Sequence, residues 1–254
     1  MIFDSHSHYD DEKFNSDREE LLSSLKDKNV YKIVDVSASL ESVSRIIELT
    51  KKYDFIYGAV GIHPDEVGSL DDDKMKYLED CAALDKIVAI GEIGLDYYWD
   101  EAPRDIQKKW FQAQIDLAKK LNKPIIIHSR DACNDTMEIL RKSENADIKA
   151  VMHCFSYSKE TAYELIDMNF MFGIGGVVTF KNAKKLKEAV ECIPMERILL
   201  ETDCPYLAPE PYRGTRNDSS LIKYVIDKIA EIKNISSADV EETAWNNTMR
   251  FYGL

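Results

Sequence analysis

The sequence lacks the features of membrane and disulfide-stabilised proteins. No apolar run approaches the roughly 20 residues that a membrane-spanning helix requires. The N-terminal segment contains Asp4, Asp10 and Asp11 and has no basic region of the kind found in signal peptides. The five cysteines show no C-x-x-C spacing, and an odd number is expected to remain as reduced thiols. We therefore expect a cytoplasmic protein with no membrane interaction, no zinc finger and no disulfide framework.

Positive charge is also scarce. The chain has 33 lysines and arginines against 46 aspartates and glutamates, which gives a net charge of −13 at pH 7. The mean electrostatic field of such a protein repels polyanions such as nucleic acid. Any phosphate-bearing substrate must therefore be held by a few local groups.

A glycine-rich dinucleotide-binding turn is missing after the first apolar run. The segment "GIGGVV" at 173–178 comes too late to serve as one and is interpreted as a tight strand end. This absence disfavours an open doubly wound sheet. No linker or low-complexity tract divides the 254 residues, so residues 1–254 are predicted to form a single domain.

Short apolar or β-branched runs alternate with segments of helical periodicity along the whole chain. Near-continuous hydrophobicity is typical of strands buried on both faces, as in parallel sheets. The eight predicted strands are 1–6, 31–38, 55–64, 86–94, 124–130, 148–155, 170–176 and 197–203. The predicted helices are 17–28, 41–52, 72–84, 103–122, 134–143, 159–168, 182–191 and 218–233, and a last helical stretch, 236–253, is expected to pack outside the sheet. Eight strand–helix units in a chain of this length predict an α/β fold, the (β/α)8 TIM barrel.

Every histidine falls at the end of a predicted strand, where barrel enzymes carry their chemistry. These residues are His6 and His8 after the first strand, His63 after the third, His128 after the fifth and His153 after the sixth, and they are joined by Glu92 after the fourth and Asp203 after the eighth. His6 and His8 point to the same side of an extended segment because they are two positions apart. The set is too rich for one tetrahedral site and suits two divalent ions that share a carboxylate, an arrangement that favours hydrolysis. His63 before Pro64 could instead be structural, and Glu92 could be a carboxylate that fills the barrel.

Several motifs, in order and spacing, identify a resemblance to a known family. They are "FDSHSHYD", "GIHP", "GEIGLDYY", "PIIIHSRDACNDT", "HCFS", "GVVTFK" and "ILLETDCPYLAPEPYRGTRN". From residue 2 to its C-terminus the chain resembles the TatD family of metal-dependent deoxyribonucleases, within the amidohydrolase superfamily. The resemblance implies a (β/α)8 barrel that holds two divalent cations, which on ligand chemistry could be zinc, manganese, nickel or magnesium.

The resemblance also implies roles for individual residues. One metal would be bound by His6, His8, Glu92 and Asp203, and the other by Glu92, His128 and His153, so that Glu92 bridges them. Asp203 would also accept a proton from the attacking water. His63 and Arg213 would contact the substrate phosphate, although Arg213 could be an ordinary surface arginine.

Two segments depart from the family pattern. This chain has "RGTRNDS" at 213–219 where many members have "RGxxNEP", and "HCFSYS" at 153–158 where they have "HCFSG". Neither departure removes a predicted metal ligand. Because both segments border the predicted mouth of the barrel, they leave the substrate preference open.

Other residues near the motifs have two interpretations each. Asp4 could orient His6 or be an ordinary polar residue of the first strand. Asp96 and Arg130 could support Glu92 and His128 or form ion pairs within loops. The aromatic residues of the same region could stack on an unpaired base or pack within their loops; they are Tyr97, Tyr98, Trp99 and Tyr206.

The favoured function is a phosphodiester hydrolase that trims single-stranded DNA ends. The alternative is an amide or ester hydrolase of the same superfamily, and a third possibility is a metal-binding protein without activity. Glu92 stands where many relatives of the second class carry a carboxylated lysine, and the nearest lysine is Lys86. Few basic residues lie near the motifs, chiefly Arg130, Arg213 and Arg216, so contact with one to three phosphates of DNA is expected. The sequence predicts no protein partner.

Overall fold

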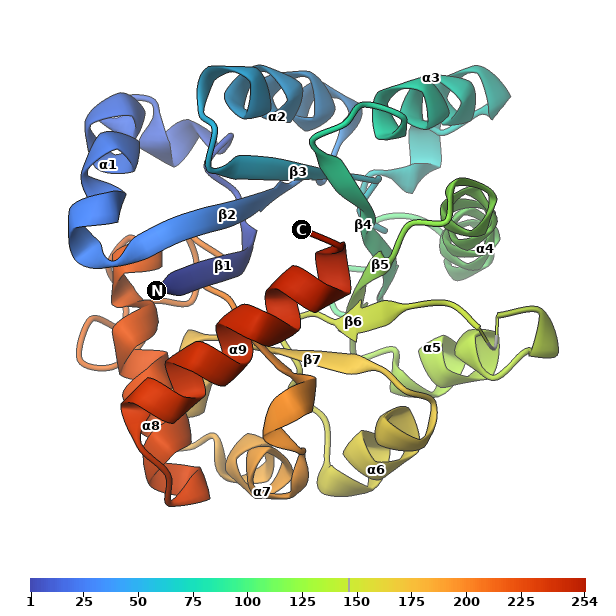
Figure 1. Ribbon diagram of the computed structural model, residues 1–254. Coiled ribbons are helices and arrows are strands. Elements are labelled where there is room, and N and C mark those ends of the chain that lie inside the picture. The colour runs from blue at the N-terminus through green and yellow to red at the C-terminus, as the bar shows by residue number, and fades with distance from the viewer. Residues whose placement is uncertain (146) are drawn as a thin grey trace. The chain divides into compact units, whose positions relative to one another are not determined.

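The computed structural model describes residues 1–145 and 147–254 and shows strands alternating with helices (Figure 1). The chain divides into two compact units. We call Met1–Asp35 together with Cys154–Leu254 the terminal unit, and Val36–His153 the central unit. The prediction that residues 1–254 form one domain stays a prediction.

The central unit contains four parallel strands. They are β3 (Ile56–Val60), β4 (Ile87–Asp96), β5 (Ile125–Arg130) and β6 (Ala150–Met152), and each pairs with the next. Its helices are α2 (Leu40–Lys52), α3 (Asp72–Ala82), α4 (Arg104–Leu121) and α5 (Cys133–Leu140). All ten residues of β4 are buried, which agrees with a strand covered on both faces.

The terminal unit contains the first and the last strands. They are β1 (Ile2–Ser7), β2 (Val30–Val36), β7 (Met171–Ile174) and β8 (Ile198–Leu200). Its helices are α1 (Arg18–Ser24), α6 (Lys159–Asp167), α7 (Lys184–Cys192), α8 (Ile222–Lys233) and α9 (Ser237–Tyr252). β1 pairs with β2 on one side, and on the other side Ser7 forms a parallel bridge with Cys204, just after β8. The first strand therefore lies beside the last, as a closed barrel requires.

The strands follow one another in sequence order from β1 to β8. Strand–helix alternation in this order is the (β/α)8 barrel, and the predicted fold class is confirmed. Several strands end earlier than predicted. Residues 148–155 and 197–203 yield only the three-residue strands β6 and β8, and left-handed backbone follows each at Cys154 (φ 45°) and Asp203 (φ 57°). A left-handed residue cannot continue a strand, so the polar motif residues form the turns beyond the strand ends.

The last helix, α9, packs against β1 and β8 of the terminal unit (Figure 1). The rings of Trp245 and Phe3 are in tilted contact with centroids 5.7 Å apart, and the Tyr252 hydroxyl donates to the Ser5 carbonyl oxygen at 3.0 Å. Asn247 donates to the carbonyl oxygen of Ile198 at 2.9 Å. These contacts cover the start of both strands. Within the described residues, no helix combines the length and the apolar character needed to cross a membrane.

Candidate metal centre

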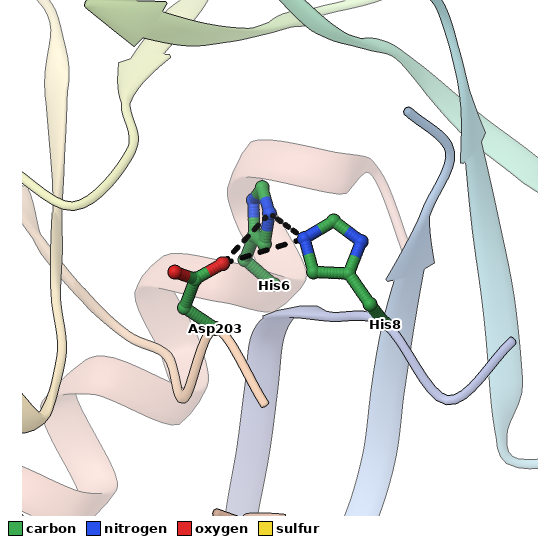
Figure 2. A group of neighbouring side chains, drawn as sticks. All are labelled: His6, His8 and Asp203. Atoms are coloured by element: carbon green, nitrogen blue, oxygen red, sulfur yellow. Dashed lines mark hydrogen bonds and ion pairs between the residues drawn. The ribbon is translucent and has the colours of Figure 1, made fainter. Parts of the chain in front are cut away.

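In the terminal unit the structure brings His6, His8 and Asp203 together (Figure 2). The Nε2 atoms of His6 and His8 are 3.1 Å apart, and Oδ1 of Asp203 lies 3.7 Å from the first and 3.3 Å from the second. The two imidazoles converge because they stand two positions apart on extended backbone, as predicted. The backbone N–H of Asp203 donates to the His6 carbonyl oxygen at 3.0 Å, which holds the turn after β8 beside β1.

The three side chains differ in their access to solvent. The side chain of His6 is 1% exposed, whereas those of His8 and Asp203 are 13% and 17% exposed. Two imidazoles and a carboxylate at the edge of a buried strand fit a divalent ion that keeps a position open for water or substrate. The donor chemistry therefore suits the predicted metal.

In the central unit, Glu92 lies between two histidines. Its Oε1 atom is 2.7 Å from Nδ1 of His128 and 3.6 Å from Nε2 of His153. The ring of His63 meets the ring of His128 edge to face, with centroids 4.3 Å apart. The predicted ligands of this unit and the predicted phosphate-binding His63 thus belong to one cluster. The prediction that Glu92 bridges two ions stays a prediction.

Asp96 holds the other side of the His128 ring. Its Oδ2 atom is 3.0 Å from Nε2 of His128. Burial alone would raise the pKa of Asp96, but the hydrogen bonds from His128 and from the N–H groups of Trp99 and Tyr98 outweigh it and lower that pKa to about 2. Burial opposes the charged form of His128, yet the bonds to Asp96 and Glu92 raise its pKa to about 9. An imidazole that binds a metal commonly donates its other ring N–H to a carboxylate, and here Asp96 is placed to accept that bond from His128.

Sequence reasoning missed Asp65. Its Oδ2 atom lies 3.4 Å from Nδ1 of His63, and burial, followed by the negative charge of Asp96, raises its pKa to about 6. A carboxylate oxygen of Asp65, one of Asp96 and a ring nitrogen of His63 all lie within 4.8 Å of one another. The sequence could have indicated Asp65 as a site residue, because it follows His63 by two positions in "HPD".

Sequence reasoning also missed Glu201, which is 1% exposed. Its Oε1 atom accepts a hydrogen bond from the backbone N–H of Cys154 at 2.7 Å, and a carboxylate oxygen lies within 4.8 Å of a ring nitrogen of His6. A Cβ atom at Gly173 would lie 2.0 Å from Oε2 of Glu201, so only glycine leaves room for this carboxylate. The sequence could have indicated Glu201 as a site residue, because it lies two positions before Asp203 at the end of a predicted strand.

Asp4 anchors the segments that carry His6 and Asp203. It is fully buried, and its Oδ1 atom accepts the backbone N–H groups of His6 at 3.3 Å and of Thr202 at 3.0 Å. Its Oδ2 atom accepts the hydroxyls of Thr202 and Ser219, both at 2.6 Å. Burial raises the pKa of Asp4 to about 7. The supporting interpretation of Asp4 is therefore favoured, and Ser219, from the segment that departs from the family pattern, is part of the support.

The three arginines near the motifs have different surroundings. Arg216 donates to both carboxylate oxygens of Asp17, which neutralises its charge. The guanidinium of Arg213 lies 4.3 Å from the ring centroid of Phe180, and that of Arg130 lies 3.8 Å from the ring centroid of Tyr98. Among the described residues, neither Arg213 nor Arg130 has a carboxylate partner. Of the two interpretations of Arg130, the loop ion pair is therefore not seen among the described residues, and its guanidinium stacks on Tyr98.

The aromatic residues divide between packing and exposure. The Tyr97 hydroxyl donates to Asp135 at 2.6 Å, and its ring lies under Arg104, so Tyr97 packs within its loop. Tyr206 is 45% exposed and donates to Asp11 at 2.9 Å. The side chains of Tyr98 and Trp99 are more exposed than those of Tyr97 and Tyr206.

Fold and site together define a (β/α)8 barrel with histidine–carboxylate clusters at the ends of its strands. A family model described as TatD related DNase matches residues 3–253. The chain belongs to this family, and the resemblance seen in its motifs is confirmed.

Relatives match over the full length. The chain is 44% identical over 254 residues to the uncharacterized metal-dependent hydrolase YabD of Bacillus subtilis (strain 168), with 100% of both chains covered. It is 34% identical over 257 residues to the uncharacterized metal-dependent hydrolase YcfH of Escherichia coli (strain K12), with 100% of this chain and 96% of the relative covered. The crystal structure of YJJV, a TatD homolog from Escherichia coli k12, matches with a TM-score of 0.93 and 27% identity, covering 100% of this chain and 98% of that one.

Proposed function

We propose that this protein is a divalent-metal-dependent hydrolase that cleaves phosphodiester bonds of DNA as an exonuclease on single-stranded ends. The observation that carries the proposal is the presence, in each unit, of a cluster in which imidazoles and a carboxylate lie within ligand distance of one another. These are His6, His8 and Asp203 in the terminal unit and His63, Glu92 and His128 in the central unit. Membership of the TatD related DNase family supports the substrate class.

The clusters suggest which residues would bind the metal ions and which residue would accept a proton. When bound, divalent ions would lower the pKa of a water molecule and stabilise negative charge on phosphoryl oxygens. The residues that would hold them are His6, His8, Asp203, Glu92, His128 and His153, and zinc, manganese, nickel or magnesium would each suit these ligands. Asp203 is the partly exposed carboxylate of its cluster, and it would take the proton of the attacking water.

Arg213 and His63 would contact the substrate phosphate. Arg213 has no carboxylate partner among the described residues, and its planar guanidinium matches two phosphate oxygens. His63, against His128, would be the second phosphate contact. Because the net charge is −13, the protein would contact few phosphates, which favours binding of a strand end over binding of a long duplex.

Glu92 bears on the choice between phosphodiester and amide substrates. Lys86 donates its ammonium protons to the carbonyl oxygens of Thr50 and Tyr53, both at 2.7 Å. This lysine therefore bonds carbonyl oxygens at the opposite end of β4, and Glu92 is the acidic residue of this strand that lies between the two histidines. A cytoplasmic location belongs to the same proposal, supported by five cysteines that are all free thiols.

The test is metal-reconstituted protein incubated with end-labelled single-stranded DNA, duplex DNA, RNA and p-nitrophenyl esters. We expect a ladder of shortened products from single-stranded DNA and none from the Asp203→Asn control. Turnover of esters without cleavage of any nucleic acid would overturn the proposal and favour the ester or amide hydrolase.

A further inference from the structure

Two neighbouring aromatic side chains stand in solvent beside the central cluster. Trp99 is 59% exposed and Tyr98 is 55% exposed, the highest values for large hydrophobic side chains among the described residues. Neighbouring exposed apolar side chains can mark a ligand-binding surface. They follow Asp96, the carboxylate that bonds His128, by two and three positions.

The position of the pair is fixed by hydrogen bonds. Oδ1 of Asp96 accepts the backbone N–H groups of Tyr98 at 2.8 Å and of Trp99 at 2.9 Å, while Oδ2 bonds His128. The backbone N–H of Tyr97 donates to the Arg130 carbonyl oxygen at 2.9 Å. The carboxylate of Asp96 therefore fixes the positions of both the His128 ring and the backbone that carries the two aromatic rings.

Arg130 adds a cation to the pair. Its guanidinium lies 3.8 Å from the ring centroid of Tyr98 and 5.7 Å from that of Trp99, and the two rings are nearly perpendicular, with centroids 5.1 Å apart. A guanidinium stacked on an aromatic ring keeps its N–H groups at the edge, where they can reach an anion. No carboxylate of the described residues pairs with Arg130, although the chain has 46 acidic residues.

An exposed indole ring next to a cation without a carboxylate partner matches the chemistry of a nucleotide. Every base has an apolar face that stacks on an aromatic side chain, and the phosphate attached to it is an anion. A base can use such a surface only when it is not stacked within a duplex. The surface therefore favours a single-stranded end.

We propose that Tyr98, Trp99 and Arg130 form a binding site for one unpaired nucleobase and its phosphate, next to the cluster of Glu92 and His128. This inference rests on the proposed function and extends it from phosphodiester bonds in general to substrates that carry a base. The site does not depend on which base is bound, since stacking accepts all four.

The first test compares two chromogenic phosphodiesters. One is the p-nitrophenyl ester of thymidine 5′-phosphate, which carries a base, and the other is methyl p-nitrophenyl phosphate, which carries none. We expect Trp99→Ala to lower the ratio of their kcat/KM values by about 10-fold, through KM of the thymidine substrate, on the basis of measured stacking strengths. Trp99→Phe should restore most of the ratio. The matched control is Tyr77→Ala, at an aromatic residue of α3 that is 40% exposed, and it should leave the ratio unchanged. An equal loss on both substrates would show a merely structural role and overturn the proposal.

The second test separates this inference from the proposed function. Metal-loaded Asp203→Asn protein is titrated with a thymidylate trinucleotide and with an abasic trimer that has the same phosphates. We expect tryptophan fluorescence to be quenched by the first and not by the second, and Trp99→Phe should abolish the response. Quenching without hydrolysis of either phosphodiester by the wild-type protein would support the base site and refute the proposed function. Hydrolysis with an unchanged Trp99→Ala ratio and no quenching would refute the base site alone.

Discussion

Replacing Asp4 with asparagine should make the stability of this protein less dependent on pH. Asp4 is fully buried, and burial raises its pKa from 3.8 to about 7. Between these two pH values the folded protein keeps a proton on Asp4 that the unfolded chain has released. The free energy of unfolding therefore falls as pH rises through this window and levels off above about pH 7.

The size of the effect follows from the two pKa values. The interval from 3.8 to about 7 corresponds to about 4 kcal/mol, at about 1.4 kcal/mol for each tenfold change in proton affinity. Asparagine has no proton to exchange in this range, so the variant should lose this part of the slope. Asp35 leaves a residual slope in both proteins, because burial and then the charge of Asp10 raise its pKa to about 8. The quantity to compare is the difference between the two slopes.

The substitution should preserve the fold because asparagine can replace each hydrogen bond of Asp4. The amide oxygen can accept the N–H groups of His6 and Thr202, which now point to Oδ1. The amide nitrogen can donate to the hydroxyl oxygens of Thr202 and Ser219, which then turn their protons to the His6 carbonyl oxygen at 3.4 Å and to the Tyr9 hydroxyl at 2.8 Å.

The assay is urea unfolding followed by circular dichroism at pH 5 and pH 8, with a chelator present so that metal binding does not contribute. Asp54→Asn, at an exposed aspartate before β3, is the matched control and should keep the wild-type slope. Equal pH slopes for Asp4→Asn and the wild type would refute the reasoning.

The remaining predictions concern the metal and the substrate. His6→Ala and His128→Ala should each lose bound metal and activity while the far-ultraviolet circular dichroism stays unchanged, since both residues lie at strand ends above the core; unchanged metal content by elemental analysis would contradict the assignment. Asp203→Asn should retain metal while turnover falls about 100-fold or more, because an amide oxygen coordinates but cannot accept the proton; near-normal turnover would remove Asp203 as the base. Arg213→Ala should weaken binding of single-stranded oligonucleotides and flatten the log–log salt dependence by about one, from a wild-type slope no steeper than about −3; a wild-type slope near −8 would indicate an extended basic track.

The sequence by itself determined the strand–helix alternation and the chemical type of the site. Continuous apolar runs such as residues 86–94 predict strands covered on both faces, and two-residue spacing predicts that His6 and His8 converge. Both are local properties, because they depend only on which side of an extended backbone a residue faces. The positions of the strand ends were less predictable, since Cys154 and Asp203 adopt left-handed backbone that no periodicity reports.

Only the tertiary structure decided which residues support the ligands. Asp4 and Ser219 are 215 positions apart, and their bond depends on the packing of the segment after β8 against β1. Asp96 serves both His128 and the turn at Tyr98 because the end of β4 lies beside the end of β5. Arg130 stacks on the ring of Tyr98, although Asp96 is its partner in the register of β4 and β5, because the carboxylate of Asp96 is directed to His128 and to the backbone of Tyr98 and Trp99. Contacts of this kind depend on distances between strands, which neither the composition nor the spacing of a sequence contains.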